Sequence, residues 1–394
     1  MDWSFLIRNK ESLCVTTDSR KVTPGCIFVA LKGEHFDGNQ FVDQARRDGA
    51  EYIISGENAL SELQDLARAW RRELGLPILG ITGTNGKTTT KELCAAVLST
   101  KYNLYYTQGN LNNQLGVPLT LLSITRAHEM AIVEMGASHP GDIRELVEIA
   151  EPNYGLITNV GRAHLQGFGS FEGVQRTKAE LYDYLRAHGG LCFRNTDNPY
   201  LAKMAGNLQT VEYQTGTIPE GTHLVGEYNA ENVQAALCVG RYFGVDEQTA
   251  LQAIRAYVPS NNRSQLMQTE KNTVVVDAYN ANPTSMAAAI NAFDKSPITN
   301  HQSPMPKAYI LGGMRELGEF SHLEHQNIVN MLAERKAETV LLVGDEYNQT
   351  TAPYPIFADV DALCAYLQAH PICGKTVLLK GSRGNQLEKA IPYL

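Results

Sequence analysis

The feature that most constrains the fold is a short apolar run followed by a glycine-rich turn and then by a helical pattern. A strand is predicted at residues 78–82, the turn covers 83–86, and a helix is expected from Lys87 to about Thr100. Apolar strand runs alternate with helical patterns along much of the remaining chain, an order typical of parallel sheets covered by helices. The sequence therefore predicts an α/β fold.

The glycine-rich turn has the chemistry of a phosphate-binding loop. Backbone N–H groups in such a turn point at a phosphate, and the start of the following helix adds roughly half a positive charge. Lys87 is placed to contact the outer phosphates, and the Thr88 hydroxyl is placed to bind Mg²⁺. We therefore expect a nucleoside triphosphate and Mg²⁺ to bind through Gly83, Thr84, Asn85, Gly86, Lys87, Thr88 and Thr89.

The match to a phosphate loop is shorter than the strict P-loop pattern. A strict P-loop has its first glycine at the position that Ile81 occupies, and the pattern that fits is Gly83-x-x-Gly86-Lys87-Thr88. The alternative is an ordinary strand-to-helix turn whose lysine is solvated. The strand–turn–helix setting favours phosphate binding, because the mechanism needs that setting.

The length of 394 residues exceeds what one hydrophobic core usually serves, so several domains are expected. A helical pattern over residues 59–73 is stopped at residues 75–77, and a second boundary is predicted at residues 259–262, which read Pro-Ser-Asn-Asn. We predict a small α/β domain at 1–76, a central P-loop domain with a parallel sheet at 77–258, and a C-terminal Rossmann-like domain at 259–394.

The coarse pattern also predicts individual elements. The first domain has an extended segment at 26–31. The middle domain is predicted to hold strands at 78–82, 130–134, 155–158 and 191–193, then helices at 229–243 and 247–257. The third domain is predicted to hold strands at 273–277, 308–311, 340–343 and 377–379.

Composition excludes several classes of protein. A net charge of −8 argues against a protein that coats nucleic acid, although local Lys and Arg can still bind small anions. No run reaches 18 apolar residues and the first residues lack a signal pattern, so no membrane insertion is expected. The seven cysteines are scattered, without Cys-x-x-Cys, which predicts free thiols rather than disulfides or zinc ligands. We expect a cytoplasmic monomer.

Polar side chains follow two further strands of the middle domain. Glu134 ends the strand at 130–134, and His164 follows the strand at 155–158. The carboxyl ends of parallel strands meet at one edge, so both residues are expected beside the phosphate loop. A carboxylate there suits Mg²⁺, whereas a histidine is a less usual ligand of that ion. The alternatives are a surface carboxylate and a hydrogen-bonded loop histidine.

Longer strings carry a resemblance to a known family. They are Gly83–Thr89, Gly109–Pro118, Glu134–Ala137, Thr158–Ser170, Thr177–Glu180, Asn229–Asn232, Asn262–Ser264, Asp277–Pro283 and Lys380–Arg383, with Asp18–Arg20 and Gly33–Gly38 near the start. In this order, and over nearly the whole chain, they resemble the Mur ligases of peptidoglycan synthesis. The strings at 109–118 and 277–283 are far more specific than the phosphate loop.

The resemblance implies an ATP-dependent amide ligase that works through an acyl phosphate. Its implied substrates are UDP-N-acetylmuramoyl-tripeptide, whose carboxylate is activated, and D-alanyl-D-alanine, whose amine attacks. The first domain is then expected to hold the UDP-sugar, and Asn232 and Arg263 to contact the nucleotide. The implied substrate-binding residues are Ser19, Arg20, Asp37, Asn112, Asn113, Asn280 and Asn282.

The resemblance also gives Lys178 a special role. A lysine at the matching place in the family is carbamylated by CO₂, and the resulting anion can bind Mg²⁺. The plain alternative is a helix-surface lysine paired with Glu180 or with neighbours of Arg176. The implied catalytic residues are Lys87, Lys178, Glu134 and His164, and the implied metal-site residues are Thr88, Glu134, Lys178 and His164.

Two departures from the family pattern stand out. The family's Leu-Gly-Asp-Met string has Gly313 in place of the aspartate, so any contact of that carboxylate is lost or comes from Arg315 or Glu316. The connection at 203–224 is short, which puts peripheral strands of the middle domain in doubt. Two other functions stay open: a sister ligase that adds a single amino acid (or a folate-type polyglutamyl ligase), and a P-loop regulatory module without an amide product.

Overall fold

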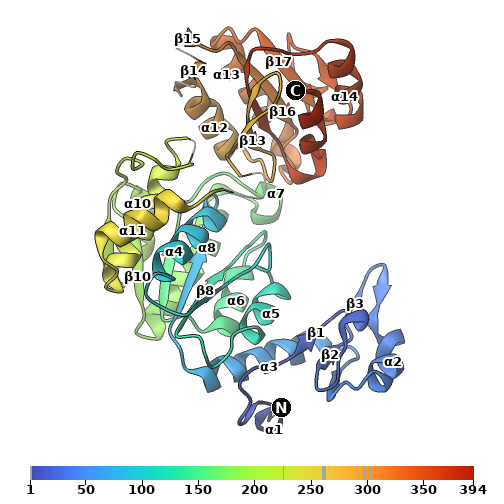
Figure 1. Cartoon of the computed structure of the whole chain (residues 1–394), viewed down its shortest axis with the longest axis vertical. Coiled ribbons are helices and arrows are strands. Elements are labelled where there is room, and N and C mark those ends of the chain that lie inside the picture. The colour runs from blue at the N-terminus through green and yellow to red at the C-terminus, as the bar shows by residue number, and fades with distance from the viewer. Residues whose placement is uncertain (1, 225, 260–262, 296–298, 301–302) are drawn as a thin grey trace.

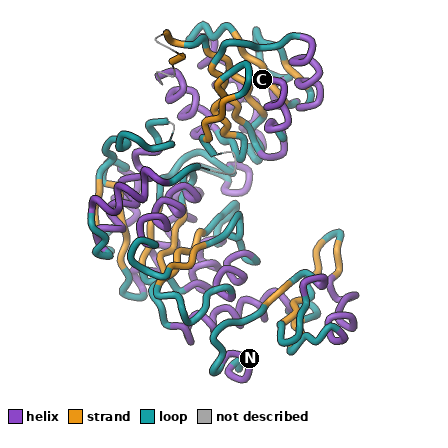
Figure 2. Tube along the Cα trace, in the orientation of Figure 1, coloured by secondary structure: helices purple, strands orange, loops and turns teal. Residues whose placement is uncertain are grey.

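The chain forms three lobes in the order of the sequence, with the two termini in opposite end lobes (Figure 1). The computed structural model describes every residue except 1, 225, 260–262, 296–298 and 301–302. Helices flank the strands of the middle and third lobes (Figure 2), so the predicted α/β fold is confirmed. Among the described residues, no helix is both long and apolar enough to cross a membrane.

The first lobe contains a small parallel sheet and a short hairpin. The sheet has the order β1-β2-β5, and the hairpin pairs β3 with β4. The predicted extended segment at 26–31 contains β2. The elements are α1 (Ser4–Ile7), β1 (Val15–Thr16), β2 (Ile27–Val29), β3 (Lys32–Gly33), β4 (Phe36–Asp37), α2 (Val42–Arg47) and β5 (Tyr52–Ile54).

The prediction that all cysteines are free is wrong for one pair. Cys14 and Cys26 form a disulfide, with their Cα atoms 4.6 Å apart. The parallel pairing of β1 with β2 brings the two residues together, and Ile27 N donates to the Cys14 carbonyl at 2.7 Å. The spacing of cysteines along the chain does not reveal this pair. Cys14 and Cys26 are neighbours only because of the register between β1 and β2.

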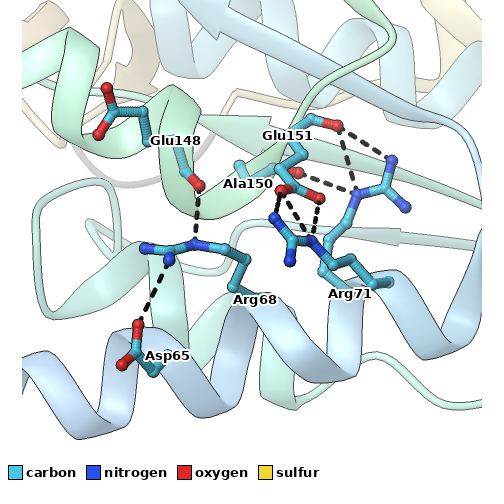
Figure 3. A network of polar contacts seen from close by, with 7 residues as sticks. Asp65, Arg68, Arg71, Glu148, Ala150 and Glu151 are labelled. Carbon is cyan, nitrogen blue, oxygen red and sulfur yellow. Dashed lines mark hydrogen bonds and ion pairs between the residues drawn. The ribbon is translucent and has the colours of Figure 1, made fainter. Parts of the chain in front are cut away.

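Helix α3 (Ala59–Leu74) joins the first lobe to the middle one and packs on the middle lobe through arginines (Figure 3). The Arg71 guanidinium is buried and donates to the carbonyl oxygens of Ala150 and Glu151 at 3.1 and 3.0 Å, and to Asn153 Oδ1 at 3.0 Å. These carbonyls end helix α6 (Asp142–Ala150), where backbone acceptors lack partners within the helix. Arg71 therefore completes that helix end.

Replacing Arg71 with methionine should lower the free energy of unfolding by about 2 kcal/mol, because buried carbonyl oxygens lose their donors. Urea unfolding followed by circular dichroism measures the change. Arg68→Met is the matched control: Arg68 lies on the same helix and donates to the Glu148 carbonyl, but its side chain is 32% exposed. Equal losses in the two variants would contradict this account of Arg71.

The middle lobe is built on a six-stranded parallel sheet of order β11-β10-β9-β6-β8-β7. All four predicted strands are present. Its strands are β6 (Ile78–Thr82), β7 (Leu104–Tyr106), β8 (Met130–Glu134), β9 (Tyr154–Ile157), β10 (Leu191–Asn195) and β11 (Gln209–Tyr213). Strand β11 lies inside the short 203–224 connection and pairs in parallel with β10. The short connection therefore still contains a peripheral strand of the sheet.

Helices cover both faces of this sheet. Alternate residues of a strand point to opposite faces, so Ile78 packs with α3, α5, α6 and α8 while Leu79 and Ile81 pack with α4, α10 and α11. The further helices of this lobe are α4 (Lys87–Leu98), α5 (Gly116–Leu122), α7 (Leu165–Phe168), α8 (Phe171–Ala187), α9 (Pro199–Ala205), α10 (Asn229–Tyr242) and α11 (Glu247–Ala256).

The third lobe has a six-stranded sheet of order β12-β13-β19-β16-β17-β18, parallel except for β12. The four predicted strands correspond to β13, β16, β17 and β19. Its elements are β12 (Gln265–Gln268), β13 (Thr273–Asp277), α12 (Pro283–Lys295), β14 (Thr299–Asn300), β15 (Ser303–Pro304), β16 (Lys307–Gly312), α13 (Ser321–Glu334), β17 (Thr339–Val343), β18 (Ile356–Phe357), α14 (Val360–Ala369) and β19 (Thr376–Lys380). Residues 260–262 of the predicted second boundary lie outside the described residues.

Candidate active site

A cavity of about 970 Å³ lies between the carboxyl ends of the middle and third sheets. It is lined from the middle lobe by the glycine-rich turn and the ends of β8 and β9, and from the third lobe by the ends of β13 and β19. The predicted site residues on its wall are Thr84, Asn85, Gly86, Lys87, Thr88, Thr89, Asn112, Asn113, Glu134, His164, Asn232, Arg263, Asn280 and Asn282.

The turn between β6 and α4 needs glycine at two positions. Gly83 has φ +141°, and a Cβ atom there would lie 2.0 Å from Thr158 Oγ1. Gly86 has φ +77°, and a Cβ atom there would lie 2.4 Å from Asn232 Oδ1. Backbone of this shape without side chains lets a ligand approach the N–H groups at the start of α4 closely.

Lys87 is folded back onto the turn. Its Nζ donates to the carbonyl oxygens of Gly83 at 2.9 Å and Thr84 at 3.1 Å. Burial lowers the pKa of Lys87, and the nearby Glu134 carboxylate opposes that shift. The ammonium group therefore lies at the cavity wall with a charge that an anionic ligand would stabilise.

Thr88 and Glu134 lie directly beside each other, as their places on α4 and β8 predict. The Thr88 hydroxyl donates to Glu134 Oε1 at 3.2 Å, and Asn112 Nδ2 donates to the same oxygen at 2.8 Å. Glu134 Oε2 is buried and accepts no hydrogen bond within the described part of the chain. Hydroxyl and carboxylate oxygens are the donors that Mg²⁺ prefers.

The donor set suits a magnesium ion that arrives with a nucleotide. Within the described residues, no three His, Cys, Asp or Glu side chains gather as a metal cage. Mg²⁺ is usually bound by one or two carboxylates together with waters and substrate phosphates. Thr88 and Glu134 fit that pattern.

Lys178 lies on α8, and its ammonium group is buried without an anionic partner among the described residues. Within the described residues, its Nζ makes no hydrogen bond or ion pair, and it lies 5.7 Å from the centre of the Phe168 ring. Burial, followed by the charge of Lys87, places the pKa of Lys178 well below its ordinary value of 10.5. Burial and the absent partner rule out the surface-lysine interpretation.

Glu180 is occupied elsewhere, at the N-terminus of α6. Its two carboxylate oxygens accept from Gly141 N at 3.0 Å and Arg144 N at 2.8 Å. A carboxylate at that position satisfies free N–H groups and interacts favourably with the helix dipole. The suggested pairing of Lys178 with Glu180 is therefore wrong.

His164 joins the two lobes instead of contacting Glu134. Its Nδ1 contacts Glu316 Oε2, and its ring meets the Phe168 ring edge to face. Burial lowers the pKa of His164, while Glu316 acts in the opposite direction. In the described structure, His164 makes no hydrogen bond to Thr88 or Glu134.

The third lobe reaches the phosphate loop through its predicted asparagines. Asn282 Nδ2 donates to Asn85 Oδ1 at 2.8 Å, whereas the Asn280 side chain accepts from Ala281 N. Lys380 is buried and donates to Asp277 Oδ2 at 2.7 Å and to the Asn280 carbonyl at 3.1 Å. The 277–283 segment is thus held at the cavity.

Three other predicted residues on the cavity wall have local partners. Asn232 accepts from Thr90 Oγ1 at 2.9 Å and lies against Gly86. The Asn113 side chain accepts from Gly116 N and so caps α5. The Arg263 guanidinium stacks 3.8 Å above the Tyr279 ring.

The predicted UDP-sugar residues lie on the first lobe, outside the cavity lining. Arg20 and Asp18 form an ion pair at 2.9 Å, and this pairing lowers the pKa of Asp18 to about 2. The Asp37 side chain accepts from Asn39 N at 3.0 Å. Ser19 begins the short 3₁₀ turn that Asp18 caps.

Sequence reasoning missed the carboxylate beside Gly313. A Cβ atom at Gly313 would lie 2.3 Å from Glu346 Oε2, so this side chain, from the loop after β17, fills the place. The expected substitutes lie elsewhere: Glu316 contacts His164, and the Arg315 guanidinium lies against Gly384, where a Cβ atom would be 2.5 Å from Arg315 Cζ. Nothing in the local sequence links residue 346 to residue 313; the link is the adjacency of β16 and β17.

Models of three related protein domains match the chain. They are "Mur ligase middle domain" at residues 81–220, "Mur ligase, glutamate ligase domain" at 262–383, and "Mur ligase family, catalytic domain" at 13–92. Together they span most of the chain and all three lobes.

Individual proteins match over almost their full length. The UDP-N-acetylmuramoyl-tripeptide–D-alanyl-D-alanine ligases of Bacillus subtilis and Escherichia coli are each 32% identical, covering 96% of this chain and 92% and 93% of those proteins. A MurF ligase from Thermotoga maritima, solved in complex with ADP, superposes with a TM-score of 0.85 at 27% identity, covering 98% of both chains. MurF from Acinetobacter baumannii gives a TM-score of 0.84 at 28% identity, covering 96% of this chain and 92% of that one. With this agreement of sequence, fold and cavity, the chain belongs to the Mur ligase family.

Proposed function

We propose that the chain is an ATP-dependent ligase that joins D-alanyl-D-alanine to UDP-N-acetylmuramoyl-tripeptide in peptidoglycan precursor synthesis. The observation that carries this proposal is that Lys87, Thr88 and Glu134 line the same cavity as the third-lobe residues Asn282 and Lys380. Relatives that share about a third of its residues over nearly their whole length carry that activity in their names.

The proposed reaction has two steps. The terminal carboxylate of the tripeptide attacks the γ-phosphorus of ATP, the bond to the leaving ADP oxygen breaks, and an acyl phosphate forms. The free amine of D-alanyl-D-alanine then attacks the acyl carbon, phosphate leaves with the carbon–oxygen electron pair, and the amine loses a proton to the surrounding solvent or phosphate. One ATP is therefore consumed for each amide bond.

The residues of the phosphate loop would act in the first step, the transfer of the γ-phosphoryl group. The N–H groups at the start of α4 and the Lys87 ammonium would hold the phosphates and stabilise the negative charge that moves onto them. Thr88, Glu134 and a carbamate on Lys178 would hold Mg²⁺; when bound, the ion supplies charge that reduces the repulsion between carboxylate and phosphate. His164, whose Nδ1 contacts Glu316, stays a proposed member of this group.

The contacts between the lobes would protect the acyl phosphate from water. Arg162 Nη1 and Glu324 Oε1 form an ion pair at 2.9 Å, and Asn282 bonds to Asn85 across the same junction. An acyl phosphate is lost if water reaches it before the amine does, so a closed junction favours amide formation. Asn232 and Arg263 are proposed to contact the nucleotide, and Asn112, Asn113, Asn280 and Asn282 the peptide substrates.

The first lobe is proposed to hold the UDP-sugar, with Ser19, Arg20 and Asp37 near its uracil and pyrophosphate. The domain limits 1–76, 77–258 and 259–394 remain our proposal. We also propose that the protein acts in the cytoplasm, where its substrates would be made, and that it is a monomer. Light scattering after size exclusion at several protein concentrations measures the oligomeric state.

Phosphate release in the presence of ATP, Mg²⁺ and UDP-muramoyl peptides tests the function. We expect release to require both the tripeptide and D-alanyl-D-alanine, with formation of one amide product identified by mass. Release with a single amino acid in place of the dipeptide would identify a sister ligase. ATP hydrolysis without an amide product in any combination would favour a regulatory P-loop module. Parallel assays with different third residues would define the preferred tripeptide.

A further inference from the structure

A second lysine of α4 is buried behind the phosphate loop. Lys91 lies one helical turn after Lys87, and its side chain is only 1% exposed. Its Nζ donates to the Thr107 carbonyl oxygen at 2.8 Å and lies 5.7 Å from the centre of the Tyr106 ring. Burying an unpaired charge costs free energy. The group that pairs with the Lys91 ammonium therefore indicates what this lysine does.

The partner is the carboxylate at the end of β8. Lys91 Nζ lies 3.8 Å from Glu134 Oε2, the oxygen that accepts no hydrogen bond among the described residues. Glu134 Oε1 is the oxygen bonded to Thr88 and Asn112 at the cavity. The two oxygens of one carboxylate therefore have different surroundings, one cationic and closed, the other facing the cavity.

Thr107 connects the Lys91–Glu134 ion pair to the sheet. Its hydroxyl accepts from Glu134 N at 3.0 Å, while its carbonyl accepts from Lys91. Thr107 itself follows β7, which pairs with β8. The backbone of Glu134 and the ammonium of Lys91 are thus held by the same residue, which fixes both ends of the ion pair.

A second carboxylate completes the surroundings of the lysine. Glu92 Oε1 lies 3.9 Å from Lys91 Nζ, and the other oxygen of Glu92 accepts from Tyr257 at 2.6 Å. Glu92 is therefore already bonded on the side away from the cavity. Of the two carboxylates beside Lys91, Glu134 is the one that reaches the phosphate loop.

We propose that Lys91 is a positioning residue that holds Glu134 by Oε2, so that Oε1 is presented to the magnesium–nucleotide side of the cavity. This inference rests on the role of Glu134 in the proposed function. Its physical basis is that a buried carboxylate without a cation turns toward water or other donors, and its cavity oxygen then loses its fixed direction. Mutating a residue that holds a metal ligand in place typically lowers metal affinity by 10–100-fold.

Mn²⁺ binding, followed by electron paramagnetic resonance in the presence of a non-hydrolysable ATP analogue, tests the proposal directly. We expect Lys91→Met to weaken Mn²⁺ binding by about tenfold or more. Lys91→Gln serves as a second variant, because its amide can still donate to the Thr107 carbonyl while the charge is gone. Lys101→Gln is the matched control: Lys101 also donates to backbone carbonyls, those of Phe243 and Gly244, and lies in the turn that follows α4.

A double-mutant cycle on thermal unfolding shows whether Lys91 acts through Glu134. Lys91→Met should lower the unfolding midpoint more in the native sequence than in a Glu134→Gln background. The Thr107 carbonyl loses its donor in both backgrounds, but only the native sequence leaves the buried Glu134 anion without its cation. Equal losses in both backgrounds, together with unchanged Mn²⁺ affinity, would show a purely structural lysine and overturn the proposal. Neither readout depends on turnover, so a failure here differs from a failure to make the amide product.

Discussion

Replacing Lys87 with alanine is expected to lower the rate of phosphate release by roughly 10²–10³-fold, equivalent to about 3 to 4 kcal/mol of transition-state stabilisation. Lys87 begins α4, and its ammonium group lies at the cavity wall, where it donates to two loop carbonyls. Negative charge shifts onto the phosphates as the tripeptide carboxylate attacks, so the lysine interacts more strongly with the transition state than with ATP. We therefore expect the loss mainly in kcat, measured at saturating ATP and dipeptide.

A matched lysine separates this effect from a change in fold. Lys101 follows the same helix, donates to backbone carbonyls and lies outside the cavity lining. Lys101→Ala should keep nearly the native rate, and circular dichroism should give the same helix content for both variants. If Lys87→Ala ligated at close to the native rate, the assignment of the turn as the phosphate site would be wrong.

The fold could be predicted largely because both buried sheets leave long apolar runs. The runs at 78–82, 130–134 and 273–277 coincide with β6, β8 and β13, since strands covered on two faces are apolar throughout. The predicted strands do not include β7, which is only three half-buried residues long and so leaves no extended apolar run. The short 203–224 connection argues against a further strand there, yet the five residues of β11 suffice for a parallel edge strand.

The parts of the site that follow from the order of the strands could be predicted from the sequence. Contacts between side chains from distant segments could not. Thr88 and Glu134 meet because β6 and β8 are neighbours whose carboxyl ends share an edge. The contact of His164 with Glu316 joins two lobes, and no local pattern reveals it. The same holds for Glu346 beside Gly313, where two adjacent strands place a carboxylate over a glycine.

Lys178 carries the second large prediction, which is an activity that depends on dissolved CO₂. Carbamylation requires a neutral amine, and burial together with Lys87 lowers the pKa of Lys178 well below 10.5. Enzyme prepared in CO₂-free buffer should lose most of its phosphate release, and added bicarbonate should restore it. Lys178→Ala should show a loss of about 10²-fold, with no recovery in bicarbonate. Full activity of Lys178→Ala, or no response of depleted native enzyme to bicarbonate, would contradict the carbamate.

The pH dependence of stability gives an independent check on the same lysine. Because its pKa is lower in the folded state than in the unfolded state, the unfolded chain binds the extra proton between those two values. In CO₂-free buffer, the stability of the native protein relative to Lys178→Met should therefore rise with pH through that window and level off near 10.5. Bicarbonate should reduce this dependence, because the carbamate replaces the titrating amine with a fixed anion. Chemical unfolding across the alkaline range, with and without bicarbonate, measures both effects. A difference that does not change with pH would show that folding does not lower the pKa of Lys178.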